Sequence, residues 1–205
     1  ALWLWTGRAV FLDLFKYWLK PFSIAFGMGV VSGVVMAYQF GTNWSEFSRF
    51  AGGITGPLLA YEVLTAFFLE ASFLGVLLFG WKRVSRRTHF ISTLMVSLGT
   101  CISAFWIMAS NSWMQTPAGH VVRDGIFYPA DWWAIIFNPS FLVRFAHMLM
   151  AAYLSTAFVV AGVAAWYLLK DRFIDLAKPM MALALLMIVP LAPLHQPYNL
   201  AAIDA

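Results

Sequence analysis

The stretch PLLAYEVLTAFFLEASFLGVLLFG, residues 57–80, decides the fold of this chain. It is longer than the roughly 20 apolar residues that an α-helix needs to cross the hydrocarbon core of a bilayer. It nevertheless carries two acids, Glu62 and Glu70. The stretch therefore predicts a membrane-spanning helix with two carboxylates inside the apolar layer.

The composition of the whole chain is that of a membrane protein. Of its 205 residues, 62% are hydrophobic and 11% are charged, whereas soluble domains carry about 25% charged residues. This predicts an all-α fold, a polytopic bundle of transmembrane helices that forms a single domain over residues 1–205. The opening residues mix tryptophan with charged residues, so no cleavable leader is expected.

Five apolar segments are expected to cross the membrane. The second is the stretch quoted above, and Pro57 suits the first position of its helix. The fourth has Asn138 as its expected N-cap. The fifth is short and closes in prolines, which suggests a truncated or re-entrant span, followed by a short outer end. The predicted spans are residues 18–39, 57–80, 89–113, 139–169 and 179–193.

The connectors between these spans alternate in charge. Two of them and the segment at the start of the first span gather the basic residues Lys16, Lys20, Lys82, Arg83, Arg86, Arg87, Lys170, Arg172 and Lys178. The positive-inside rule places these segments in the cytoplasm, which explains the net charge of +4 without a nucleic-acid partner. Amphipathic rings prefer the membrane boundary, and four tryptophans fall at the expected outer one: Trp44, Trp113, Trp132 and Trp133.

Glu62 and Glu70 are the first candidates for chemistry. On a regular α-helix, residues eight apart are separated by about 12 Å along the axis and about 80° around it. Carboxylates at this depth normally face a bundle interior, pair, ligate a metal or relay protons. The alternative is a helix-packing role, in which a Ser or Thr hydroxyl satisfies each acid.

His147 lies in the outer part of the fourth span. Imidazole is the commonest metal and haem ligand, although a lone membrane histidine can instead hydrogen-bond another helix. Arg144, three residues earlier, lies on nearly the same helix face and is a candidate partner of a haem propionate. Snorkelling of Arg144 to the outer surface is the alternative. We find no glycine-rich phosphate loop and no nucleophile elbow, which argues against nucleotide enzymes and hydrolases.

Six motifs resemble subunit I of cytochrome bd-type quinol oxidases, in the order of that family. They are QFGTNW (39–44), AFFLE (66–70), FGW (79–81), NSWMQTP (111–117), NPSFLVRFAH (138–147) and AWYLLK (165–170). The resemblance runs from the second helix of the family to the loop after its sixth. It implies a bacterial or archaeal inner-membrane respiratory enzyme that oxidises quinol outside and reduces dioxygen to water with cytoplasmic protons.

The resemblance also implies a role for each candidate residue. His147 matches the axial histidine of the low-spin haem b, near the outer surface. Glu62 matches the glutamate at the haem d iron, and Glu70 matches the glutamate near the high-spin haem b on the proton route. Ser103 and Asn111 match polar positions beside that route. A haem b in the place of haem d is the alternative, and the implied partners are subunit II, small single-span subunits and lipid.

The sequence also departs from the family pattern. Ala37 and Ala71 stand where a glutamate and a serine are usual, so a proton path is expected to differ. The end LHQPYNLAAIDA (194–205) resembles the start of the quinol-oxidising loop, with Asn199 for a lysine and Asp204 for a glutamate. These two residues are the candidates for quinol contact, and the HQP triplet at 195–197 fits the shorter-loop, cyanide-insensitive branch.

The first family helix, with a haem-ligating histidine, and the last helices, with the methionine opposite His147, have no match in these residues. We expect the chain to be part of a longer subunit, a split-gene product or a divergent relative with fewer haems. The alternative functions are a haem-poor structural or assembly subunit and a proton-coupled transporter.

Overall fold

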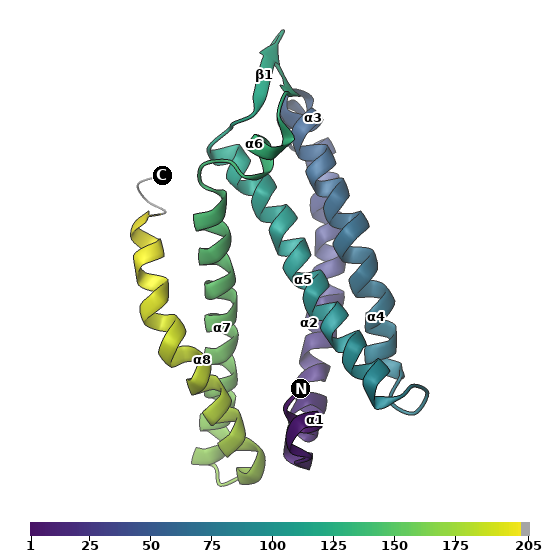
Figure 1. The fold of residues 1–205 in the computed structure, drawn as a ribbon, viewed down its shortest axis with the longest axis vertical. Coiled ribbons are helices and arrows are strands. Elements are labelled where there is room, and N and C mark those ends of the chain that lie inside the picture. Colours follow the sequence, from purple (N-terminus) through teal and green to yellow (C-terminus); the bar gives the residue numbers. More distant parts are fainter. Residues whose placement is uncertain (202–205) are drawn as a thin grey trace. The chain divides into compact units, whose positions relative to one another are not determined.

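The computed structural model describes the backbone of residues 1–201 and the side chains of residues 1–195. Within this part, five helices are long and apolar enough to cross a membrane. The described residues are helical apart from short connectors and one two-stranded hairpin (Figure 1). The predicted all-α fold with about five spans is confirmed.

The five long helices are α2 (Ala9–Thr42), the continuous segment made of α3 (Ser45–Glu62), the π-helix η1 (Val63–Phe67) and α4 (Phe68–Phe79), then α5 (Arg86–Gln115), α7 (Phe141–Leu169) and α8 (Ile174–Ala201). Four of them are longer than the predicted spans, whereas α7 begins two residues after the start of its predicted span. Two short helices, α1 (Leu2–Thr6) and α6 (Trp132–Ile136), precede α2 and α7. Helix α8 begins before and ends after the predicted span 179–193. Each proline inside it removes one backbone hydrogen bond but does not end the helix, so the prolines do not mark the end of the span.

Helix α3 begins well before Pro57, so the prediction that this proline takes the first position of its helix is wrong. Its first turn carries Glu46, which is favourable near the positive end of a helix, and Arg49 binds this carboxylate at 2.9 Å. Pro57 lies inside the helix. Most of the stretch between the first two predicted spans, residues 40–56, is therefore helical.

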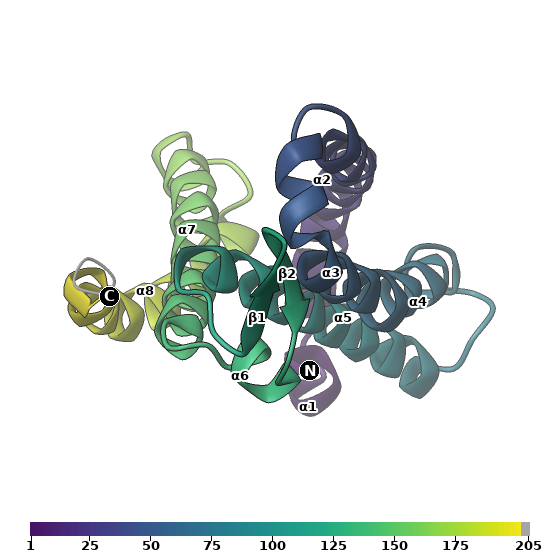
Figure 2. The same ribbon diagram turned by 90° about the horizontal axis from the view of Figure 1, so that it is seen from above.

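Contacts divide the chain into two compact units. One contains residues 1–29 with most of α7 and α8, and the other contains residues 30–145. The first unit is built on Leu14, Ala164 and Met180, which are buried together from α2, α7 and α8. In the same unit the hydroxyls of Tyr17 and Tyr167 are 3.0 Å apart. Helices α7 and α8 lie side by side in both views (Figures 1 and 2).

In the second unit, α5 packs along the whole of the α3–η1–α4 segment (Figure 2). Its core consists of Ala51, Ile54, Leu58, Trp113 and Ile135, with contributions from α3, α5 and α6. The long helix pair is therefore fixed at one end by this core. The acids of the α3–η1–α4 segment lie further along the same helix pair.

A hairpin that the sequence analysis did not predict covers this core. Strands β1 (His120–Arg123) and β2 (Ile126–Pro129) pair in antiparallel register. The turn residues Asp124 and Gly125 both have positive φ, 52° and 75°, as the tight Asp-Gly hairpin turn requires. Phe127 of β2 packs against the core, and its carbonyl lies 3.3 Å from the position of a Cβ on Gly53.

The hairpin region also explains why Trp113, which was predicted to lie at the outer membrane boundary, is buried in the protein. Trp113 is only 2% exposed, and its indole N–H donates to the carbonyl of Ala118 at 3.0 Å. It is a core residue, because the connector folds back over it. Trp44 and Trp133 remain exposed, at 50% and 73%.

Asn138 does not cap α7, contrary to the prediction. The helix begins at Phe141, and the Asn138 amide donates to the Ser112 hydroxyl at 2.9 Å and to the Ile135 carbonyl at 3.1 Å. Its side-chain oxygen accepts from Thr116 at 3.1 Å. Asn138 therefore ties the end of α5 to α6 through a buried polar network.

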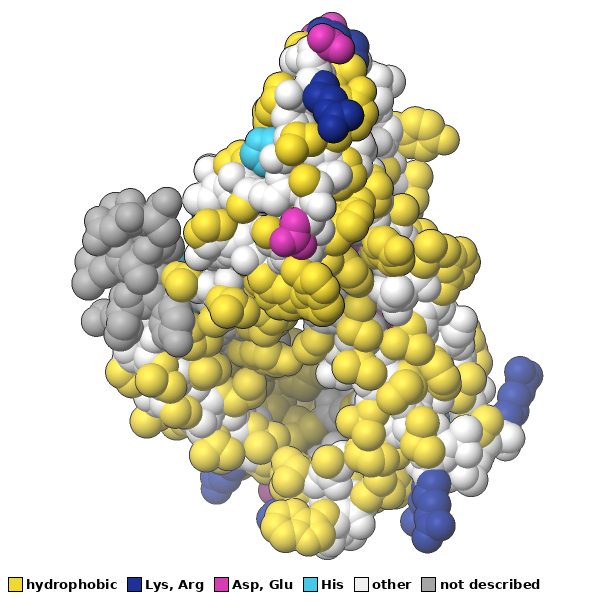
Figure 3. Space-filling view, turned by 45° about the horizontal axis from the view of Figure 1, so that its top comes forward, with side chains coloured by type: hydrophobic (Ala, Val, Ile, Leu, Met, Phe, Trp, Pro, Cys, Tyr) yellow, Lys and Arg dark blue, Asp and Glu magenta, His cyan; other side chains and the backbone are white. Residues whose placement is uncertain are grey.

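The outer surface of the helices is apolar. Hydrophobic side chains cover most of the face seen in Figure 3, and the apolar window of α2 has no buried residue within this chain. Ile24, Val31 and Val35 of α2 are all more than half exposed. Such surfaces are stable against lipid or against further helices, and not against water.

Candidate functional site

Glu62 and Ser103 meet at the centre of the helix pair in the second unit. Glu62 is the last residue of α3, and the Ser103 hydroxyl of α5 donates to its Oε1 at 2.7 Å. The two residues are far apart in sequence, and both were predicted as site residues. The hydroxyl satisfies one oxygen of a half-buried acid, which removes much of the cost of placing that acid in an apolar segment.

A second pair of contacts fixes the register of the two helices beside Glu62. The Trp106 indole donates to the Thr65 hydroxyl at 2.9 Å, and its ring stacks on Tyr61 with centroids 5.3 Å apart. Sequence analysis did not single out these residues. The available signal was spacing, because Thr65 follows Glu62 by three residues and Trp106 follows Ser103 by three, which places each on the same helix face.

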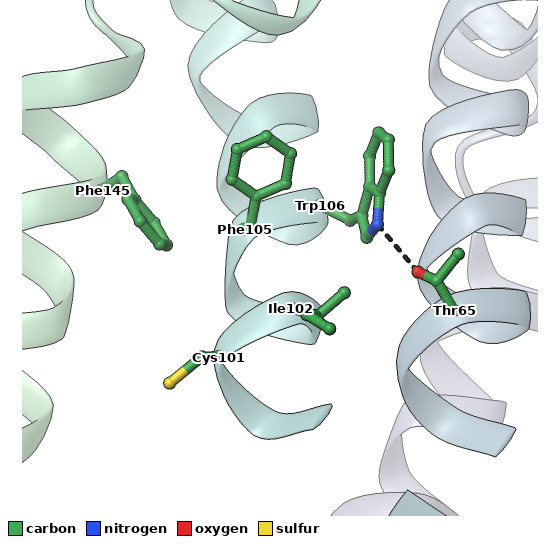
Figure 4. Close-up of a pocket in the computed structure, with 6 residues that line it drawn as sticks. All are labelled: Thr65, Cys101, Ile102, Phe105, Trp106 and Phe145. Carbon is green, nitrogen blue, oxygen red and sulfur yellow. Dashed lines mark hydrogen bonds between the residues drawn. The ribbon is translucent and has the colours of Figure 1, made fainter. Parts of the chain in front are cut away.

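Next to these contacts lies a pocket of about 430 Å³ in the second unit (Figure 4). Its walls are Thr65, Cys101, Ile102, Phe105, Trp106 and Phe145. Figure 4 shows the Thr65 hydroxyl turned to the Trp106 indole, so this polar group is already engaged. The lining therefore suits an apolar group and offers no charge to a polar substrate.

Glu70 is more deeply buried than Glu62. Its side chain is 8% exposed in the first turn of α4 and lies against α5 at Gly99. Thr100, one residue further on, lies near its carboxyl group. The Thr100 hydroxyl itself donates to the Val96 carbonyl of α5 at 3.1 Å. Glu70 was predicted as a site residue, whereas Gly99 and Thr100 were not.

The π-helix between the two acids changes their predicted geometry. In η1 the N–H of Phe68 bonds to the carbonyl of Val63, five residues back. One such turn absorbs one extra residue, so eight residues across it advance the helix face about as far as seven residues of regular α-helix. That corresponds to about 20° instead of about 80° between Glu62 and Glu70. Both acids consequently face α5.

His147 lies in the first unit, in contact with a second histidine. Its ring and that of His195 on α8 have centroids 4.3 Å apart at an interplanar angle of 34°. His147 Nδ1 and His195 Nε2 are buried and have no hydrogen-bond partner among the described residues. A buried imidazole with an unused nitrogen fits the axial ligand of a haem iron.

Arg144 lies one turn before His147 on α7 and contacts Asn111. Its Nη2 donates to Asn111 Oδ1 at 2.8 Å, while its Nε is buried without a partner among the described side chains. A guanidinium that pairs only with a neutral amide retains capacity for an anion. Asn111 thus orients Arg144, and its predicted place beside a proton route stays a prediction.

Two predicted site residues cannot be placed. The side chain of Asn199 and all of Asp204 lie outside the described residues. Among the residues that are described, no three His, Cys, Asp or Glu side chains gather into a metal site. The chemistry of the described part therefore rests on the two acids with their hydroxyl partners and on the histidine pair.

Comparisons with known proteins identify the family of the chain. The family model for cytochrome bd terminal oxidase subunit I matches residues 1–198. The chain is 40% identical to cytochrome bd ubiquinol oxidase subunit 1 of Bacillus subtilis over 91% of its own length and 40% of that protein. It is 41% identical to cytochrome bd-II ubiquinol oxidase subunit 1 of Escherichia coli, over 82% of this chain and 33% of the relative.

The fold is also similar to a solved structure. It matches the bd oxidase from Geobacillus thermodenitrificans with a TM-score of 0.90 and 28% identity, over 97% of this chain and 46% of the other. The chain spans less than half the length of each of these relatives. Because the family model covers almost every residue, the chain belongs to the cytochrome bd terminal oxidase subunit I family.

Proposed function

We propose that this chain is the haem-bearing electron-transfer part of a respiratory bd-type quinol oxidase. In this function, electrons from membrane quinol reduce dioxygen to water with protons from the cytoplasm. The observation that carries the proposal is the placement of two acids inside an apolar segment, both facing hydroxyl-bearing residues of α5. Carboxyl groups are energetically costly to place within the membrane, and those that occur there normally serve ion or proton transfer. The two relatives described above are both named ubiquinol oxidase subunits.

His147 is the residue that would hold the low-spin haem b. Its imidazole has an unused buried nitrogen, and Arg144 on the same helix has an unused Nε that would pair with a propionate. Glu62 would serve the haem d, or a haem b in its place, and Glu70 would serve the high-spin haem b. When bound, the haems supply one-electron transfer and the reduction of dioxygen.

The residues of this chain would handle the protons of that reaction. Ser103 orients the Glu62 carboxylate by donating to Oε1, which leaves Oε2 for an iron or a proton. Glu70 is shielded from the surroundings by α5 and has the Thr100 hydroxyl beside it. Because both acids face the same helix, protons would pass between them along α5.

The location and partners follow from the same proposal. The basic connectors would face the cytoplasm of a bacterial or archaeal cell, and the quinol-loop-like end with Asn199 and Asp204 would lie outside the inner membrane. The exposed apolar faces would contact lipid, the rest of subunit I, subunit II and small single-span subunits.

The test is to purify the complete complex and record oxygen consumption with quinol together with reduced-minus-oxidised spectra. His147→Ala should remove the low-spin haem b bands. His120→Ala, a change of histidine in the hairpin, should leave them unchanged. Bands that survive His147→Ala would rule out the ligand assignment. A wild-type complex that lacks haem bands would instead favour a structural or assembly subunit, which the departures at Ala37 and Asn199 also suggest.

A further inference from the structure

Glu70 lies against α5 where that helix has its single glycine. A Cβ at Gly99 would stand 2.4 Å from Glu70 Cγ and 3.4 Å from its Cδ. Carbon atoms pack best at about 3.5–4.0 Å, so no other residue fits beside this side chain as it stands. The stem of Glu70 therefore occupies the space that a side chain at position 99 would fill.

The neighbours of Glu70 leave it little room to move aside. Ala66, one turn earlier on the same helix face, is fully buried, and its carbonyl oxygen lies 3.4 Å from the same Cβ position. The close approach involves Cγ, the second atom of the side chain. To avoid a Cβ at position 99, the Glu70 side chain would have to rotate about χ1. This rotation would carry its carboxyl group away from Thr100.

Backbone geometry does not explain this glycine. Gly99 is in the interior of α5 and does not have a positive φ, so an L-residue could adopt its conformation. Glycine in a helix interior is destabilising relative to alanine, and small residues in membrane helices serve close approach. Here the group that approaches is the side chain of an acid.

We propose that Gly99 is the positioning residue of Glu70, holding its carboxyl group against α5 by leaving space for its stem. The importance of this position for catalysis rests on the proposed function. The contact itself does not, because it follows from the packing of α4 on α5.

The first test is a double-mutant cycle for thermal stability of the complete complex. Gly99→Ala should lower the unfolding temperature, and adding Glu70→Ala should restore it, because the clashing stem is then absent. Gly75→Ala is the matched control, since Gly75 is also inside a helix and a Cβ there meets nothing within 4 Å. If Gly99→Ala fails to fold, recovery in the double variant still supports the proposal. A double variant as unstable as Gly99→Ala would overturn it.

The second test asks where the carboxyl group goes. Infrared spectroscopy of the complex should show a carboxyl band that disappears in Glu70→Gln. This band should shift in Gly99→Ala and keep its position in Gly75→Ala. An unmoved band in folded Gly99→Ala would overturn the positioning role. The band needs no turnover, so a wild-type complex without oxidase activity would contradict the proposed function and leave this test intact.

Discussion

Replacing Ser103 by alanine removes the hydroxyl that donates to Glu62 Oε1. The donor–acceptor distance of 2.7 Å is that of a well-formed O–H···O hydrogen bond. A hydrogen bond to a charged group contributes about 1.5–3 kcal/mol, and about 1.4 kcal/mol corresponds to a tenfold change. If Glu62 acts in this geometry, quinol-driven oxygen consumption of the purified complex should fall by roughly 10- to 150-fold.

Two variants make this experiment specific. Ser103→Thr keeps a hydroxyl and should retain most of the rate. Ser92→Ala lies on the same helix and removes only a hydrogen bond to the Thr88 carbonyl, so it should change the rate little. A Ser103→Ala complex with wild-type turnover and a full haem spectrum would show that the contact with Glu62 has no part in the reaction.

Three further predictions concern other contacts. His195→Ala removes the ring that packs against His147 and should shift the spectrum of the proposed low-spin haem b. His195→Phe keeps a ring there and should preserve the wild-type spectrum. Identical spectra for the two variants would exclude a stacking role. Asn138→Ala leaves buried partners unsatisfied and should cost about 2–3 kcal/mol in thermal unfolding; an unchanged transition would contradict this. Tyr17→Phe loses one hydrogen bond to Tyr167 and should cost about 1 kcal/mol or less by the same measurement, so a larger loss would indicate further roles.

The transmembrane fold could be predicted because hydropathy over 20 or more residues is a strong signal. The ends of the helices were harder to predict from the sequence. Pro57 is typical of a helix start, but the helix already forms at Ser45, and tertiary packing keeps the proline inside it. Asn138 is a good N-cap residue, yet its amide serves the buried network between α5 and α6. In both cases long-range contacts outweighed a local preference.

The missed hairpin is different, because its signal was present. Asp124 and Gly125 stand between two short runs of strand-forming residues, which is the pattern of a tight hairpin. Buried Trp113 shows the consequence, since a structured connector can cover an aromatic residue that hydropathy assigns to the membrane boundary. The individual acids and His147 were identifiable from their cost in lipid, whereas Gly99 and Thr100 carry no such cost and became visible only through packing.

The spacing of the two acids limits how a proton could pass between them. About 10–11 Å of helix axis separates Glu62 from Glu70 across the π-helix, far more than the reach of one hydrogen bond. The Ser103 hydroxyl, however, donates to Glu62, and Thr100, three residues earlier on the same face of α5, carries a hydroxyl near Glu70. Transfer would thus require these hydroxyls together with bridging water. The π-helix favours this route, because it reduces the angle between the acids around the helix from about 80° to about 20°.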